Sequence, residues 1–188
     1  TVGAAGDLTV RVDGSTPDSQ DIPKNGANIL FSVFAFEAGD NEDVRVEQLV
    51  LSREGLGLPG DFDNVKLYVD GVQKGGEKTV NTTTNTATFN LTSDPIMVDA
   101  GTTALVEVRG DMTGAENSQN KFCINTTDDV TAYGETTDTE LAVDGDFSAC
   151  GEFMTTTSAS VGTLTYKVSQ PSTAEINVGD TDVIMTKL

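Results

Sequence analysis

Short runs of alternating apolar and polar residues recur along the chain, and they constrain its fold more than any other feature of the sequence. Alternation with a period of two is typical of β-strands that bury one face. It occurs at residues 8–12, 65–69, 87–91 and 104–108. No segment of ten or more residues has the period of an amphipathic helix. We therefore predict an all-β fold.

Local details of these runs refine the prediction. Ile29–Phe36 is a nearly continuous apolar run, as expected of a strand that is covered on both faces. The apolar phase changes after Val46, which indicates a β-bulge near Glu47–Gln48. Asp70-Gly71 lies between two strand-like runs and is typical of a type I′ hairpin turn. The spacing of turn residues favours an antiparallel β-sandwich, Ig-like in the broad sense.

The start of the sequence is repeated near its end. Residues 6–12 (GDLTVRV) are similar to residues 162–168 (GTLTYKV), and after a short deletion Leu30-Phe31 falls on Val183-Ile184. The second copy covers only the first two predicted strands. We therefore divide the chain into a sandwich domain, residues 1–161, and a truncated repeat, residues 162–188.

A two-stranded segment is at best marginally stable alone, so residues 162–188 need a partner. Three interpretations follow: these strands complete their own domain, they enter a neighbouring copy by strand addition, or they belong to a longer tandem array. Strand addition between copies would build a head-to-tail filament or surface layer. In that case the pocket-filling side chains would be Leu164, Tyr166, Val168, Ile176, Val183, Ile184 and Met185.

Several segments carry a resemblance to a known group of domains. Gly6–Pro17, Ile29–Phe36, Asp61–Gln73 and Asp99–Asp111 resemble the β-sandwich repeats of large secreted or surface proteins of uncultured candidate-phyla bacteria. The resemblance implies an extracellular, scaffold-like role and carries no catalytic residues. Residues 112–160 depart from the pattern.

The chain has two cysteines, Cys123 and Cys150, separated by 27 residues and lacking a C-x-x-C motif. They could be two buried thiols, which behave as small apolar side chains. We favour a disulfide, which indicates an oxidising, extracellular or cell-surface location.

Charge and the absence of histidine narrow the function. With 11 basic and 30 acidic residues the net charge is −19, which disfavours binding to nucleic acid or to anionic lipid. No run of apolar residues is long enough for a membrane span, so we expect no membrane insertion. Without histidine, the Ser-His and Cys-His nucleophile pairs are unavailable, and we expect no enzymatic activity.

Two further kinds of site are candidates. Acidic residues in predicted loops could bind structural Ca²⁺, although solvated charge is the simpler interpretation, and no other cofactor is expected. The candidate ligands are Asp40, Asp43, Asp61 and Asp63. Three sequons place possible N-linked glycans at Asn81, Asn90 and Asn125, in a Thr-rich chain where such triplets arise by chance.

These observations favour a secreted structural subunit that assembles with copies of itself by strand exchange. The alternative is an adhesion or carbohydrate-binding module of a multi-domain surface protein, since loops of a sandwich readily carry binding sites. Zero tryptophans and 6% aromatic residues leave few platforms for sugar stacking.

Overall fold

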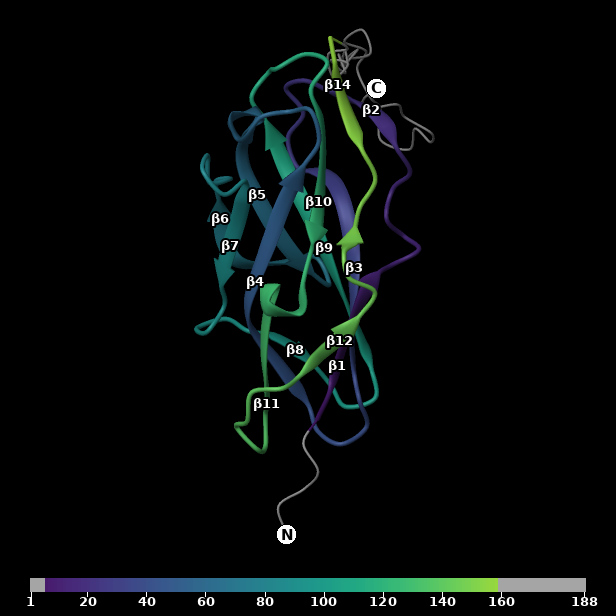
Figure 1. Ribbon diagram of the computed structural model, residues 1–188, viewed down its shortest axis with the longest axis vertical. Coiled ribbons are helices and arrows are strands. Elements are labelled where there is room, and N and C mark those ends of the chain that lie inside the picture. The colour runs from purple at the N-terminus through teal and green to yellow at the C-terminus, as the bar shows by residue number, and fades with distance from the viewer. Residues whose placement is uncertain (1–5, 159–188) are drawn as a thin grey trace, which may run out of the picture.

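The strands of the protein assort into two sheets that enclose a common core (Figure 1). The computed structural model describes residues 6–158. Within that range the helices are two single 3₁₀ turns, η1 (Pro59–Asp61) and η2 (Thr127–Asp129), and none of them is long enough to span a bilayer. The predicted all-β sandwich is confirmed.

The first sheet has six strands and contains the long apolar strand of the sequence. In spatial order its strands are β12 (Val143–Gly145), β1 (Leu8–Val12), β3 (Ile29–Ala38), β9 (Thr103–Met112), β5 (Phe62–Val69) and β6 (Val72–Lys78).

The second sheet is built around β4 (Val44–Glu54), the longest strand of the described residues. Its main order is β11 (Val130–Gly134), β4, β10 (Gln119–Ile124), β14 (Met154–Thr157) and β2 (Gln20–Pro23). Three more strands pair with it: β7 (Thr86–Asn90) and β8 (Ile96–Val98) with β4, and β13 (Ala149–Cys150) with β10.

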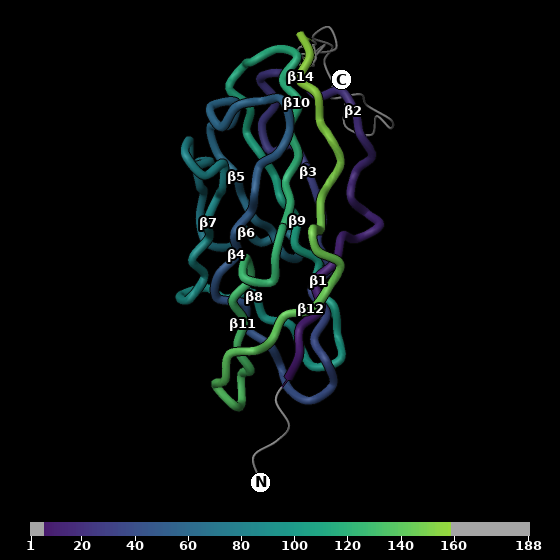
Figure 2. Tube along the Cα trace, in the orientation of Figure 1, coloured from purple at the N-terminus to yellow at the C-terminus, as the bar shows by residue number. Residues whose placement is uncertain are grey.

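The sheets of the predicted antiparallel sandwich also contain two parallel strand pairs. Most pairs are antiparallel, but β1 runs parallel to β12 and β2 runs parallel to β14 (Figure 2). Parallel pairs need long crossover connections. Both pairs join the beginning of the chain to its last described strands, so no local turn could have indicated their direction.

Three local predictions are confirmed. Thr131 of β11 pairs with Gln48 and the next residue, Ala132, pairs with Val46, so Glu47 is the extra residue of a bulge. Asp70 (φ 51°) and Gly71 (φ 76°) form the turn of the β5–β6 hairpin, and two positive φ values are the requirement of a type I′ turn. The continuous apolar run forms β3, in which six consecutive residues are buried.

Phenylalanines from both sheets make the centre of the core. A register shift at Phe31 turns this side chain to the same side as Phe34 and Phe36. Its ring lies 5.3 Å from the ring of Phe62 in β5 and 5.5 Å from that of Phe122 in β10. The edge-to-face contact between Phe31 and Phe122 and the tilted contact between Phe62 and Phe122 (5.1 Å) join the two sheets.

The other face of β3 is also covered, which explains why an alternating pattern is missing there. Val33 and Ala35, which alternate with Phe34 and Phe36 along β3, are also buried. At the edge of β3, the Thr16 hydroxyl donates to the carbonyl oxygen of Val33 (2.9 Å) and accepts from the Val33 amide (2.9 Å). Gly151 lies over Ser32, where a Cβ would come within 2.8 Å of the serine Cβ. Both faces of β3 are therefore buried.

The strands run along the long axis of the molecule, so the sandwich has two ends (Figure 1). We call the end with the β3–β4 loop, residues 39–43, the Glu42 end. At the other end, β4 finishes and β14 reaches Thr157 beside the loop 113–118. We call this the Asp61 end, because η1 lies there.

Candidate functional site

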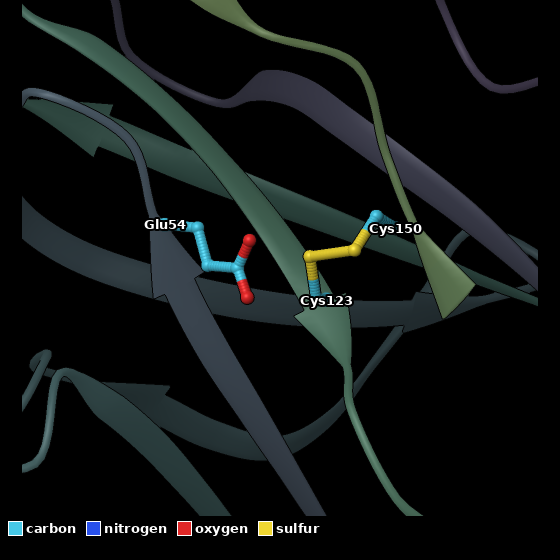
Figure 3. Close-up of side chains that lie close together, drawn as sticks. All are labelled: Glu54, Cys123 and Cys150. Carbon is cyan, nitrogen blue, oxygen red and sulfur yellow. A yellow bond between two sulfur atoms is a disulfide. The ribbon is translucent and has the colours of Figure 1, made fainter. Parts of the chain in front are cut away.

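The two cysteines form a disulfide that joins β10 to β13 within the second sheet, as the sequence predicted. Cys123 of β10 and Cys150 of β13 are directly paired, with Cα atoms 4.1 Å apart. The carboxylate of Glu54 lies beside the sulfurs (Figure 3). These three residues are the one group in residues 6–158 with the spacing of a metal site. Because both sulfurs are covalently bonded, they are not thiolate ligands, and the group is structural.

The four predicted calcium ligands are divided between the ends of the sandwich. Asp40 and Asp43 are exposed in the β3–β4 loop, where the Asp43 carboxylate accepts a hydrogen bond from the Ala100 amide (2.8 Å). Asp61 is buried at the other end of β4, and its neighbour Asp63 is exposed. Calcium binding stays a prediction, and each pair would need ligands from elsewhere.

Asp61 is the centre of a buried polar network that sequence reasoning missed. Its Oδ2 atom accepts hydrogen bonds from the Leu58 amide (2.7 Å), from the Asn120 side chain (3.2 Å) and from the Ser118 hydroxyl. These three donors already occupy the Oδ2 atom within the fold. Through Oδ2, Asp61 therefore holds the β4–β5 loop to the start of β10.

Arg53 supplies the positive charge of this network. Its guanidinium is buried and donates to Asn120 Oδ1 (2.8 Å) and to Asn85 Oδ1 (3.1 Å). Burial lowers the pKa of Arg53, while the neighbouring Asp61 charge raises it. The amide of Asn120 thus links a buried cation to a buried anion, which is the arrangement that buried charges require.

A second buried carboxylate, Glu42, was also missed. It accepts hydrogen bonds from the amides of Gly6 (2.9 Å), Thr136 (3.0 Å) and Thr137 (2.9 Å), and from the Thr137 hydroxyl (2.8 Å). The hydrogen bond from Gly6, followed by those from Thr137 and Thr136, lowers the pKa of this carboxyl group. Glu42 therefore ties the first described residues to the loop after β11.

The three sequons differ in their surroundings. Asn81 and Asn90 are exposed, and each uses its side-chain oxygen to cap a turn, at Thr83 and Thr92 respectively. Asn125 is half-buried beside the disulfide, and its amide nitrogen donates to Glu54 (3.3 Å). Glycosylation modifies this nitrogen, so Asn81 and Asn90 are the more accessible acceptors, and all three stay predictions.

The seven predicted donor-strand residues, Leu164 to Met185, lie outside the described residues. The strands that they repeat are described, and β1 is fully integrated in its own sandwich. β1 pairs along its whole length with β3, and its first three residues also pair with β12. Its Leu8 and Val10 side chains are completely buried. The place that a donated strand would fill is therefore occupied by the chain's own β1.

The comparisons with known proteins leave the family open. No protein-family model and no curated protein matches the sequence. Among solved structures, the seventh ScaB type I cohesin from Pseudobacteroides cellulosolvens aligns with TM-score 0.36 and 11% identity, covering 87% of this chain and 99% of that chain. The third ScaB cohesin of R. flavefaciens, solved in complex with a group 1 dockerin, aligns with TM-score 0.29 and 6% identity, covering 83% and 97%. Likeness at this level assigns neither family nor function.

Proposed function

We propose that the protein is a non-catalytic structural module of an extracellular assembly, and that residues 162–188 connect its sandwich to a second unit of the same fold. Such a unit needs more strands than residues 162–188 supply. The disulfide supports an oxidising location. The two buried carboxylates of the ends serve packing and loop anchoring, which supports a structural role.

One observation carries this proposal. Residues 162–168 repeat β1, yet β1 itself is present, paired on both sides and buried. The second copy of the strand is therefore surplus to the described sandwich. A surplus copy that keeps the glycine, the leucine and the alternation of the first one is explained if it begins another sandwich.

Exchange of this segment into a complete neighbouring copy is the second route to an assembly, and packing disfavours it. There residues 162–168 would displace β1, and Tyr166 would take the place of Val10. Val10 is completely buried, and inserting a much larger side chain into a packed core costs about 1–3 kcal/mol. In a separate second unit the neighbouring strands can differ in sequence and accommodate Tyr166, so this cost does not arise.

A tandem polypeptide tests the proposal. Because Ile184 aligns with Phe31, residues 1–184 are followed directly by a second copy of residues 32–158, and Tyr166→Val is included because Tyr166 takes the place of the buried Val10 in this second unit. We expect two folded sandwiches, seen as two disulfides in the intact mass and as roughly twice the folded signal of the single unit in urea denaturation. The matched control carries residues 162–184 in shuffled order and should fold only its first sandwich.

The same experiment can refute the proposal. If the second unit stays unfolded with the native order of residues 162–184, the repeat does not begin a sandwich. Strand exchange is tested separately by measuring the mass of the protein across a concentration series. Polymers that disappear when residues 162–188 are deleted would support exchange over a connected second unit.

A further inference from the structure

Three adjacent strands bring a carboxylate and both cysteine sulfurs together on the second sheet. Along β10, Cys123 pairs with Cys150 of β13 and Lys121 pairs with Glu54 of β4. The two sulfurs and a Glu54 carboxylate oxygen all lie within 4.8 Å of one another (Figure 3). Reduction of the disulfide would turn this group into two thiols beside a carboxylate, and a thiol that loses its proton is a metal ligand.

The side chains around the group are placed as they are around metal sites. Asn125 Nδ2 donates to Glu54 Oε1 (3.3 Å), and the Ser148 hydroxyl lies 3.5 Å from the Cys150 sulfur. Polar neighbours of this kind orient the ligands of a metal and hold their charge. Lys121 Nζ lies 3.6 Å from Glu54 Oε2. Its positive charge would offset the single net negative charge that two thiolates and a carboxylate leave around a divalent cation.

A second atom of Asn125 supplies an independent observation. Asn125 Oδ1 is buried and has no hydrogen-bond partner within residues 6–158. Buried acceptors are almost always paired, and an unpaired one indicates a place for a water molecule or an ion. This oxygen belongs to the same amide that contacts Glu54. It therefore lies beside the carboxylate, where a water molecule bound to a metal would donate to it.

We propose that the reduced form of the protein binds one Zn²⁺ ion through Cys123, Cys150 and Glu54. Zinc takes four ligands, from thiolate, imidazole or carboxylate groups and water, and this chain has no histidine. Two thiolates, one carboxylate and one water molecule make up that number. Cys123 is completely buried, but Cys150 and Glu54 are half-buried, so the ion can enter from their side. The ion would link β10 to β13, as the disulfide does in the oxidised protein.

The disulfide and the zinc site are alternative states related by reduction. A phosphine or a dithiol supplies two electrons and is itself oxidised to a phosphine oxide or a disulfide. The bond between the two sulfurs breaks, and each sulfur gains a proton. Binding of Zn²⁺ then releases both protons, because the ligands are thiolates. The inference is independent of the proposed function, since it concerns the protein without its disulfide.

Metal binding by the full chain, kept reduced with a phosphine, tests the proposal. Co²⁺ is the probe, because thiolate ligands give it an intense charge-transfer absorption. We expect one Co²⁺ per chain, displaced by one Zn²⁺, and no such absorption in the oxidised protein. Glu54→Gln should weaken Zn²⁺ binding at least about 10-fold. The matched control is Glu37→Gln, since Glu37 is exposed on β3 of the other sheet, and it should bind Zn²⁺ like the wild type.

A second measurement covers the case in which the reduced protein folds poorly. Zn²⁺ should raise the urea midpoint of the reduced wild type and leave that of the oxidised protein unchanged. Reduced protein that gives no charge-transfer absorption with excess Co²⁺, and no rise of the urea midpoint with Zn²⁺, would overturn the proposal. Equal Zn²⁺ affinities of the wild type and Glu54→Gln would overturn the assignment of Glu54 as a ligand.

Discussion

The two ends of the sandwich use the same device, a buried carboxylate, in different ways. At one end Glu42 accepts three backbone amides and one hydroxyl, from segments that are far apart in sequence. At the other end Asp61 accepts one backbone amide and two side-chain donors, and Arg53 lies close enough to interact with its charge. Amides satisfy the first carboxylate, whereas a network with a cation satisfies the second.

The difference lies in what each carboxylate supports. Glu42 links Gly6 to the loop that contains Thr136 and Thr137. Asp61 holds a loop whose apolar side chains point away from the protein. A buried carboxylate therefore indicates anchoring at both ends, and the exposure of Leu56 and Leu58 distinguishes the Asp61 end from the Glu42 end.

The largest loss of stability is expected from removal of the disulfide, which lies between the two ends. Replacing both Cys123 and Cys150 by alanine opens a loop of 27 residues, and the chain-entropy model gives a loss of about 3.5 kcal/mol in the free energy of unfolding. Urea denaturation measures this loss. Because β10 carries Cys123, hydrogen exchange should increase at both ends together. An increase at the Asp61 end alone would show that the ends unfold independently.

Asp61 should give the next largest effect. The change Asp61→Ala leaves the buried Arg53 guanidinium without its anion, and removal of one partner of a buried pair costs about 3 kcal/mol. Adding Arg53→Met should restore part of the loss, since an apolar pair of similar volume is tolerated. Asp63→Asn is the matched control, because Asp63 is exposed, and it should change stability by less than about 0.5 kcal/mol. Equal losses for Asp61→Ala and Asp63→Asn would contradict the role of the network.

The parts of the fold that depend on neighbours in sequence were predictable. The Asp70-Gly71 turn, the bulge at Glu47 and the doubly covered strand β3 each follow from a few adjacent residues. Short strands with few apolar residues, such as β2 and β13, were missed. Their pairing is fixed by partners more than a hundred residues away or by the disulfide, and no local pattern reports such contacts.

The buried carboxylates could not be separated from the other acidic residues by sequence. Asp61 and Asp63 stand two positions apart in similar surroundings, and only Asp61 meets Ser118 and Asn120, which lie 57 and 59 residues further on. The preceding turn, Leu58-Pro59-Gly60, is the one local signal, since an aspartate after such a turn can accept the amide at its start. The exposure of Leu56 and Leu58 likewise follows from the loop's anchoring and not from their type.

The smallest loss of stability is expected from a change at Glu42. Its dependence on pH distinguishes the Glu42 end from the Asp61 end. Its folded-state pKa is lowered from 4.5, chiefly by the Gly6 amide, so the stability that it supplies is complete above that value and is lost as the pH falls through the lowered pKa. Glu42→Gln should therefore reduce the urea midpoint at about pH 7, and the difference from the wild type should shrink towards about pH 3.

The control for this change is Glu152→Gln, since Glu152 is exposed, and it should leave the urea midpoint unchanged at both pH values. Hydrogen exchange of residues 135–139 should increase in Glu42→Gln at neutral pH, because the carboxylate holds the Thr136 and Thr137 amides. Residues 55–58, at the Asp61 end, should exchange as in the wild type. A difference between the two proteins that stays constant down to low pH would mean that the charge of Glu42 does not stabilise this end, and that its shape alone fills the site.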